Sequence, residues 1–358
     1  MSPTHSDDTR SLIAGRIRQA RQEGSSCSLT VGELSAFLRQ VLVHGGAGDE
    51  TASVLAENCA HAERDGAHSH GVYRMPGYLS TLGTRWVDGH AVPQVADISP
   101  SIVAVDARNG FAQPALKAAL PLLISKARAT GIVQVLIKDS HHFGALSLDV
   151  EPLASLGFVA LTSVNGTSHM AAHGGARPVY GTNPMAFAVP RLRGNPIVFD
   201  QASSVMARGD VQLAAEAGTQ VPPGVGNDRH GRPTTDPRAI LDGGMLLPFG
   251  GHKGSSIAMM VEILAAAMTG GNFSHEVDKS MFPGAHTSRT GQFLLCMDPC
   301  RAAGEGFAGR VEALAEKLLE SGQSRLPGDR RYAQRAISER TGIKLDPDIL
   351  LALQDTLR

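Results

Sequence analysis

Residues 131–146 read GIVQVLIKDSHHFGAL, an apolar run that leads into a polar turn. The run Ile132–Ile137 is rich in β-branched residues and has the length of one buried strand. The turn after it offers Ser140, His141 and His142, and backbone amides at a strand end suit phosphates and carboxylates. We therefore predict a strand that brings polar groups to a ligand site. A polar turn that only caps the next helix is the competing interpretation.

Other apolar runs of strand length follow residue 100, and helical patterns separate them. The expected strands are SIVAVDA (101–107), GFVALTSVN (157–165), PMAFAVP (184–190), PIVFDQA (196–202) and QFLLCMDP (292–299). The expected helices cover roughly residues 113–130, 145–156 and 254–269. This alternation predicts a mixed α/β fold. Residues 210–242 are rich in Gly, Pro and Asp and are expected to form a long loop with at most a short helix.

The chain before residue 100 has a helical pattern instead. Thr30 and Glu33 form the capping box of a helix that ends at Gly45–Gly46. Its apolar residues recur at helical spacing: Leu34, Phe37, Leu38, Val41 and Leu42. A second helix is expected over residues 51–64.

These patterns divide the chain into four segments. Residues 1–27 are a polar extension, expected to be frayed or weakly helical, and residues 28–110 are a helical region. Residues 111–304 form the α/β domain, and residues 305–358 are helices expected to pack on the N-terminal region.

Composition excludes several classes of protein. The 358 residues carry 33 Lys and Arg against 34 Asp and Glu, so no basic field favours nucleic acid or an anionic membrane. No apolar run is long enough to span a bilayer, and the N-terminus lacks a signal-peptide pattern, so we expect a cytoplasmic protein. The four cysteines show no CxxC spacing and are expected to be reduced.

Residues 65–76, DGAHSHGVYRMP, place Ser69 beside His70 and Arg74 four residues further on. If residues 69–74 are helical, His70 and Arg74 share a face, so a proton donor stands next to a fork suited to a carboxylate. Pro76 limits how far such a helix can run. The competing interpretation is a helix start with Ser69 as its cap.

Two further stretches contain candidate site residues. LPFGGHKG (247–254) puts Lys253 at the start of an apolar helix, which suits an anion, although the glycines could serve only as a tight entry into the helix. In DQASSVMARGDV (200–211), Arg208 could contact an acidic substrate and Asp210 could orient a histidine. A surface salt bridge explains this spacing equally well.

Nucleotide and metal motifs of the common kinds are missing. No GxGxxG follows a strand, and neither GxxxxGK[ST] nor HExxH occurs. His68, His70, His141 and His142 could bind a metal, but no carboxylate completes a known spacing, so we predict no metal.

Six stretches in order resemble one family, the malate/L-lactate dehydrogenase type 2 family of nicotinamide-dependent reductases. They are DGAHSHGVYRMPGY, DSHHFGAL, YGTNPMAFAVP, DQASSVMARGDV, LPFGGHKG and RLPGDRRY. The match runs from about residue 28 to the C-terminus. Within the family, HHFGAL, GDVQ, VPPGVGNDRHGRPTTDPRAIL and RLPGDRRY are most similar to the delta-1-piperideine-2-carboxylate/delta-1-pyrroline-2-carboxylate reductases.

The resemblance implies reduction of a cyclic imine acid to L-pipecolate or L-proline with NADPH, or alternatively NADH. It also implies a homodimer and a non-Rossmann cofactor domain, within residues 111–304, that has a largely antiparallel mixed sheet. The alternative within the family is an NAD(P)-dependent dehydrogenase of 2-hydroxy acids such as malate, lactate or ureidoglycolate, which would act on a 2-oxo acid in the reverse direction.

The resemblance also assigns residues. His70 would be the proton donor, with Ser69 and Asp210 as relay partners, although in some relatives the histidine at His142 is the acid/base. The substrate would contact Arg74, Thr182, Arg208 and Gly209. The cofactor would contact His142, Phe143, Gly144, Ala145, Leu146, Asp200, Gln201, Ala202, Gly251, Leu326, Pro327, Gly328, Asp329, Arg330, Arg331 and Tyr332. The extension, Gln201 and Ser203 depart from the commoner pattern of the family.

Overall fold

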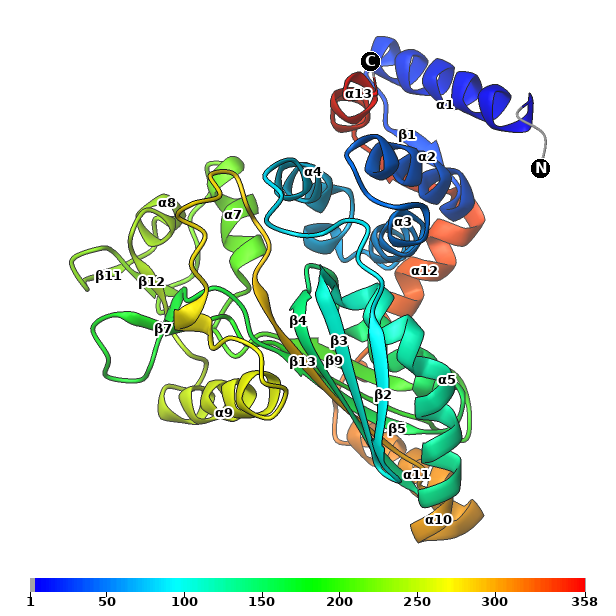
Figure 1. The fold of residues 1–358 in the computed structure, drawn as a ribbon, viewed down its shortest axis with the longest axis vertical. Coiled ribbons are helices and arrows are strands. Elements are labelled where there is room, and N and C mark those ends of the chain that lie inside the picture. The colour runs from blue at the N-terminus through cyan, green and yellow to red at the C-terminus, as the bar shows by residue number, and fades with distance from the viewer. Residues whose placement is uncertain (1–3, 358) are drawn as a thin grey trace. The chain divides into compact units, whose positions relative to one another are not determined.

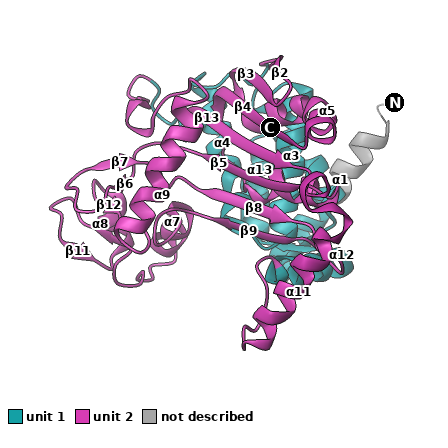
Figure 2. Cartoon of the chain, turned by 90° about the horizontal axis from the view of Figure 1, so that it is seen from below, with its two compact units in different colours: residues 1–90, 282–286, 329–358 teal, residues 91–281, 287–328 magenta. Residues whose placement is uncertain are grey.

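The computed structural model describes the backbone of residues 4–357 and the side chains of residues 13–357. The chain forms two compact units (Figures 1 and 2). Unit 1 comprises the residues up to His90, Phe282–His286 and the residues from Asp329 onward, and unit 2 comprises Ala91–Met281 and Thr287–Gly328.

Unit 1 is mainly helical. Its elements are α1 (Thr4–Glu23), β1 (Cys27–Leu29), α2 (Val31–His44), α3 (Asp49–Arg64), the 3₁₀ turns η1 (His68–His70) and η2 (Val72–Arg74), α4 (Met75–Gly83), α12 (Asp329–Thr341), β14 (Ile343–Leu345) and α13 (Pro347–Asp355). The short strands β1 and β14 pair antiparallel, so they join the two ends of the chain within this unit.

Helix α2 confirms the predicted capping box. The Thr30 side chain accepts the Glu33 backbone N–H, and the Glu33 carboxylate accepts the Thr30 N–H at 2.8 Å. The buried side chains of α2 are the predicted ones: Leu34, Phe37, Leu38, Val41 and Leu42. The expected helix over residues 51–64 is also present, as α3.

The extension at residues 1–27, expected to be frayed or weakly helical, is helical over most of its described part. Residues 4–23 form α1, which buries Ile13, Ile17 and Ala20. Arg16 pairs with Glu33 of α2 at 2.6 Å. These few apolar positions, spaced three or four residues apart, hold an otherwise polar helix on its unit. Residues 1–3 of the extension lie outside the described residues.

Unit 2 is a mixed α/β unit. Its strands are β2 (Gln94–Ser99), β3 (Ile102–Phe111), β4 (Ile132–His141), β5 (Val159–Val164), β6 (Met170–Ala171), β7 (Pro178–Tyr180), β8 (Met185–Val189), β9 (Ile197–Gln201), β10 (Gly226–Asn227), β11 (Pro233–Thr234), β12 (Met245–Leu246) and β13 (Arg289–Met297). Its helices are α5 (Ala112–Thr130), α6 (Ser147–Ser155), α7 (Arg208–Glu216), α8 (Pro237–Leu241), α9 (His252–Glu262), the π-helix η3 (Ile263–Ala267), η4 (Ser274–Glu276), α10 (Cys300–Ala303), η5 (Gly304–Gly306) and α11 (Phe307–Glu320).

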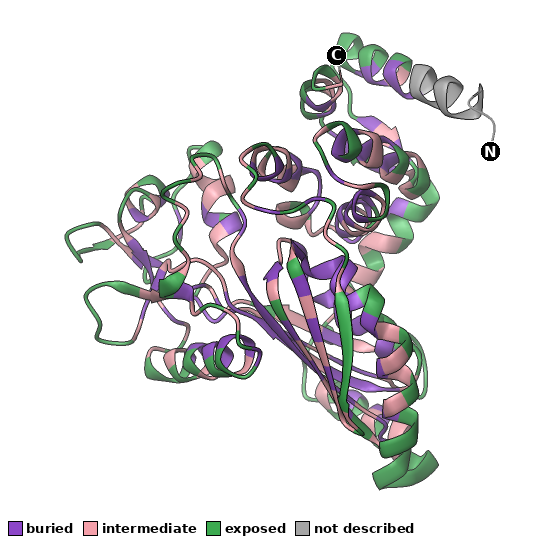
Figure 3. Ribbon diagram, viewed as in Figure 1, coloured by how far each residue is buried: buried purple, intermediate pink, exposed green. Residues whose placement is uncertain are grey.

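A seven-stranded sheet has the order β2-β3-β4-β13-β5-β8-β9. Strands β3 and β4 run parallel, and the other neighbours run antiparallel. The edge strand β2 is exposed along most of its length (Figure 3), while α5 packs on β3 and β4. A five-stranded sheet of short strands has the order β11-β10-β12-β6-β7. The predicted mixed α/β fold and its strands are confirmed.

Three regions differ from expectation. Residues 91–110, expected in the helical region, contribute β2 and β3 to the large sheet, and α11 lies in unit 2. The predicted loop at 210–242 contains α7, α8, β10 and β11. These short elements bury a small apolar core that the Gly- and Pro-rich composition obscured: Met170, Val211, Val221, Val225, Ile240, Leu246 and Ala258. No helix among the described residues is long and apolar enough to cross a membrane.

His141, the last residue of β4, is fully buried. Its Nδ1 lies 2.8 Å from Thr287 Oγ1 and its Nε2 lies 2.9 Å from Asn109 Oδ1. A neutral ring suits both partners, since one nitrogen accepts from the hydroxyl and the other donates to the amide oxygen. Burial, together with the charges of Arg289 and Lys279, lowers the pKa of His141 to about 3.

This lowered pKa predicts acid destabilisation. The unfolded chain protonates His141 below about pH 6.5, whereas the folded protein does not until about pH 3. Stability from this residue is therefore present above pH 6.5 and is lost as the pH falls, by about 2 kcal/mol at pH 5. Urea unfolding at pH 7 and pH 5 should show that His141→Gln, although less stable at pH 7, loses less stability between the two pH values. An equal loss in both proteins would contradict the assignment.

Candidate functional site

The Ser-His stretch of unit 1 forms two 3₁₀ turns, so the condition that residues 69–74 form one helix is not met. Gly71 has φ −95° and ψ −133°, a conformation that is neither helical nor extended and that separates η1 from η2. Helix α4 starts at Met75 with Pro76 in its first turn, so Pro76 helps to begin a helix and does not limit one. The non-helical backbone at Gly71 explains the difference.

Ser69 and His70 are in contact. The Ser69 Oγ lies 3.1 Å from His70 Nδ1. Ser69 is not a helix cap, because the residue before η1 is Ala67 and it makes no side-chain cap. If the hydroxyl donates to Nδ1, the proton of a neutral His70 ring lies on Nε2. The pair can therefore present one N–H of defined orientation to a ligand.

Glu63, which the sequence analysis missed, holds this turn. The side chain is buried at the end of α3, where Oε1 accepts the Val72 N–H at 2.8 Å and Oε2 pairs with His68 Nδ1 at 2.6 Å. The hydrogen bond from Glu63 raises the pKa of His68. Glu63 follows the buried Cys59 by four residues on α3, and this position on the apolar face was the signal available in the sequence.

Arg74 ends η2, one turn after His70. Asp65, which opens the same stretch, is buried and pairs with Arg64 at 2.7 Å and with Arg335 of α12 at 2.6 Å. Burial would raise the pKa of Asp65, but these pairs outweigh it and lower the pKa. They also tie the start of the Ser-His stretch to α12.

In unit 2, the predicted strand-to-turn junction after β4 is confirmed, and it carries a buried His–Asp pair. His142 Nε2 lies 3.0 Å from Asp149 Oδ2, and both side chains are about 5% exposed or less. Asp149 Oδ2 also accepts Gln292 Nε2 of β13 at 2.8 Å. Asp149 and Gln292 were missed because the partners come from α6 and from a distant strand.

The structure brings three predicted cofactor stretches together at β9. Asp200 Oδ2 accepts the Ser147 N–H at 2.9 Å, at the start of α6 and directly after residues 142–146. The Pro327 carbonyl accepts the Val198 N–H at 3.2 Å, and Leu326 is buried. Residues 326–328 thus run beside β9. Asp329, Arg330, Arg331 and Tyr332 belong to unit 1, where they begin α12.

Thr182 lies next to the same stretch of β9. The Ser203 N–H donates to the Thr182 carbonyl at 2.7 Å. Helix α7 begins with Arg208, Gly209 and Asp210, which form its first turn. These three residues are therefore spaced as in a helix.

Arg208 also acts on two groups that the sequence analysis missed, His169 and Lys279. Burial, Arg208 and Lys279 lower the pKa of His169 to about 3, and burial and Arg208 lower the pKa of Lys279. Neighbouring cationic groups of this kind favour an acidic ligand.

Gly251 precedes α9, which starts at His252 as predicted. Its φ of 63° favours glycine, and a Cβ there would lie 3.3 Å from the His173 ring. Among residues 13–357, no three His, Cys, Asp or Glu side chains gather as a metal site would need.

The fold and site define a mixed α/β protein with a Ser–His pair in one unit and clustered polar turns in the other. Residues 29–354 match the malate/L-lactate dehydrogenase family. The chain belongs to this family.

Relatives extend this finding. The chain is 56% identical over 323 residues to a Delta(1)-pyrroline-2-carboxylate/Delta(1)-piperideine-2-carboxylate reductase of Pseudomonas syringae pv. tomato, covering 90% of this chain and 94% of that protein. The crystal structure of a delta1-piperideine-2-carboxylate reductase from the same organism superposes with a TM-score of 0.90 at 55% identity. The superposition covers 92% of this chain and 99% of that chain. A (2R)-3-sulfolactate dehydrogenase (NADP(+)) of Chromohalobacter salexigens is 43% identical over 284 residues, which cover 79% of this chain and 84% of that protein.

The packing around Gly71 generates a prediction. A Cβ at this position would lie 2.5 Å from Glu63 Cγ, so Gly71→Ala must displace Glu63 or the turn that carries His70. We expect a loss of about 1–3 kcal/mol in unfolding free energy and at least a tenfold loss in kcat/KM.

Gly83→Ala is the matched control, because Gly83 lies in α4 of the same unit with nothing within 4 Å of an added Cβ. Urea unfolding and steady-state kinetics should leave this control close to the unsubstituted protein. Equal effects of the two substitutions would show that Glu63 and Gly71 do not fix the turn.

Proposed function

We propose that this protein is a nicotinamide-dependent reductase of cyclic imine acids, which converts delta-1-piperideine-2-carboxylate or delta-1-pyrroline-2-carboxylate to L-pipecolate or L-proline. The observation that carries this proposal is the 56% identity to a reductase of that name over 90% of the chain. The Ser69–His70 contact supports it, because the reaction needs a proton donor.

The chemistry assigns roles to the side chains. The nicotinamide supplies a hydride to C2 of the protonated C=N bond, whose π electrons become the lone pair on nitrogen. His70 would maintain the proton on the imine nitrogen, and Ser69 would fix the ring that delivers it. Asp210 would assist as a relay partner. Arg74, Thr182, Arg208 and Gly209 would hold the carboxylate and ring of the substrate, since a guanidinium fork matches a carboxylate.

The cofactor would bind along the stretches that meet at β9. These are His142, Phe143, Gly144, Ala145, Leu146, Asp200, Gln201, Ala202, Leu326, Pro327 and Gly328, with Gly251, Asp329, Arg330, Arg331 and Tyr332 as further contacts. The N-terminal end of α9, with its positive helix dipole, would suit a phosphate group. This would be a non-Rossmann site, because it uses a largely antiparallel sheet. We favour NADPH over NADH, with Lys253, Arg330 or Arg331 at the 2′-phosphate.

A dehydrogenase of 2-hydroxy acids is the second candidate. The 43% identity to a (2R)-3-sulfolactate dehydrogenase (NADP(+)) supports it, and a 2-oxo acid also carries a carboxylate beside the reacting carbon. The higher identity and coverage of the reductase favour the imine. A homodimer remains a prediction from the family.

His70 and His142 compete as proton donor, and substitution separates them. We expect His70→Ala to lower kcat by about 10²- to 10⁴-fold while the Kd of NADPH changes little. His142→Ala should mainly weaken NADPH binding, measured by fluorescence titration. The reverse pattern would make His142 the proton donor.

The substrate is tested by NADPH oxidation with both cyclic imines, pyruvate and oxaloacetate side by side, repeated with NADH. We expect an imine to give the highest kcat/KM. A 2-oxo acid that exceeds both imines by tenfold, about 1.4 kcal/mol in transition-state stabilisation, would instead establish the dehydrogenase. Absence of binding to both NADPH and NADH would reject both functions.

A further inference from the structure

Glu262, the last residue of α9, has a buried carboxylate with 5% of the residue exposed. Burial of a carboxylate is strongly unfavourable unless its oxygens accept hydrogen bonds. Asn183 Nδ2 donates to Oε1 at 2.8 Å, Asn165 Nδ2 donates to Oε2 at 3.2 Å, and Ser274 donates its N–H to Oε2 at 3.0 Å and its hydroxyl to Oε1. An ionised carboxylate has about four acceptor positions, so the four donors match it.

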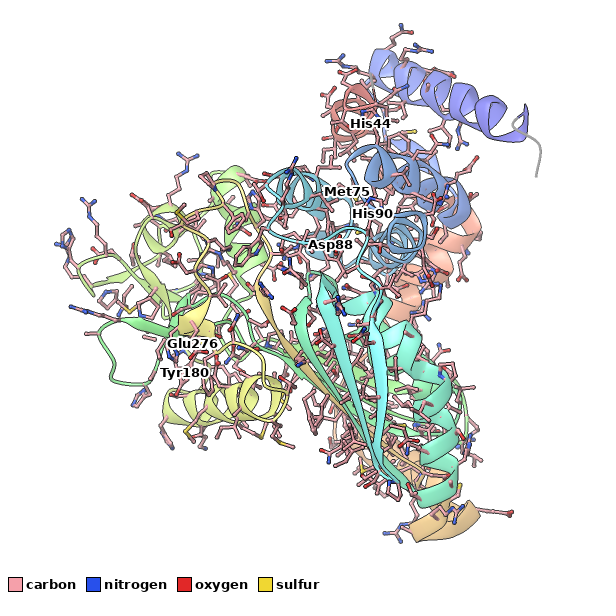
Figure 4. The ribbon with its side chains drawn as sticks, viewed as in Figure 1. His44, Met75, Asp88, His90, Tyr180 and Glu276 are labelled. Carbon is pink, nitrogen blue, oxygen red and sulfur yellow. The ribbon has the colours of Figure 1, made fainter. Side chains whose placement is uncertain are left out.

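These donors come from separate loops of unit 2. Asn165 follows β5, Asn183 lies between β7 and β8, and Ser274 begins η4. Figure 4 shows Tyr180, at the end of β7, close to Glu276, at the end of η4, beside α9. Glu262 therefore joins three loops at one carboxylate.

Asn183 transmits this constraint to Thr182. Its φ of 41° is left-handed, and its side-chain amide also donates to the Ala258 carbonyl at 3.0 Å. On the other side, the Asn183 carbonyl accepts the Ser203 hydroxyl at 2.6 Å, and the Thr182 carbonyl accepts the Ser203 N–H at 2.7 Å. The Thr182–Asn183 backbone is thus fixed between Glu262 and the residues that follow β9.

The helix that carries Glu262 is itself fixed. It continues as the π-helix η3, and π segments occur frequently at functional sites. A Cβ at Gly291 of β13 would collide with the Ala265 carbonyl of η3, so the helix and the strand pack backbone to backbone. Glu262 cannot shift along this contact without disturbing the central sheet.

We propose that Glu262 is a positioning residue for the reaction. Through Asn183 it sets the place of Thr182, which is a substrate contact in the proposed function, and the inference rests on that function. Glu262 itself touches neither substrate nor cofactor in this proposal.

Glu262→Gln tests the proposal. The glutamine replaces one acceptor oxygen with an NH₂ group, which can only donate. An NH₂ group in place of Oε1 faces the donors of Asn183 and the Ser274 hydroxyl. An NH₂ group in place of Oε2 faces the donors of Asn165 and the Ser274 N–H. We expect KM for the preferred substrate to rise at least tenfold, kcat to fall less than threefold, and the Kd of NADPH to stay within twofold. An unchanged KM in the folded variant would overturn the proposal.

Glu312→Gln is the matched control. It makes the same chemical change at a buried carboxylate of unit 2, which pairs with Arg191 at 2.7 Å. This control should lower the melting temperature and leave KM unchanged. If both variants raise KM equally, the effect of Glu262 is one of general stability and the proposal fails.

A double-variant cycle examines the route through Thr182. In a Thr182→Ala background, Glu262→Gln should change KM by less than twofold, because coupled residues give non-additive effects. A full tenfold rise in KM in that background would show that Glu262 does not act through Thr182. If Glu262→Gln does not fold, Ser274→Ala is the substitute variant, because it removes the hydroxyl donor to Glu262 and keeps the backbone N–H donor. We expect Ser274→Ala to raise KM at least twofold. An unchanged KM would again overturn the proposal.

Failure of the proposed function would look different. The unsubstituted protein would then consume no NADPH with any imine, whereas failure of the Glu262 inference leaves its turnover intact. If a 2-oxo acid is the true substrate, the same comparison applies to the KM of that acid.

Discussion

The cost of burying a carboxylate constrains the candidate site in both units. A buried carboxylate that lacks donors is unstable, so each one draws nearby amides and rings into fixed positions. Glu63 holds the Val72 amide beside the Ser-His turn, and Asp149 holds His142 after β4. Glu262 holds Asn183 in the same way. Within each unit, the groups that satisfy these buried charges belong to loops that carry candidate site residues, so folding of the unit also fixes those loops.

The features that could be predicted from sequence are those with local causes. The capping box of α2 and the apolar runs of β3, β4 and β5 depend on residues within a few positions of each other, and all of them are present. Chemistry-bearing turns after β4 and before α9 were found for the same reason. The positions of the family motifs identified the family, which the comparison with known proteins confirms.

The features that could not be predicted depend on distant partners. Strand β13 lies between β4 and β5 although about 130 residues separate it from β5, and its register shifts between Thr290 and Gln292. No periodicity in residues 289–297 reveals those neighbours. Glu63 and Glu262 look like ordinary helical acids until their partners fold around them. The non-helical backbone at Gly71 also lies in a packed place, because the Glu63 side chain occupies the space that a Cβ would take.

The histidines show how the environment assigns a role that residue type does not. His141 and His142 are adjacent, yet the first uses both ring nitrogens for contacts in the core and the second gives its Nε2 to Asp149. The Asp149 contact takes one ring nitrogen of His142. The Ser69 contact at His70 uses only Nδ1 and directs a neutral ring to carry its proton on Nε2. The two contacts therefore differ in kind: a carboxylate holds His142 and a hydroxyl holds His70, so the environment and not the residue type sets how each ring is oriented.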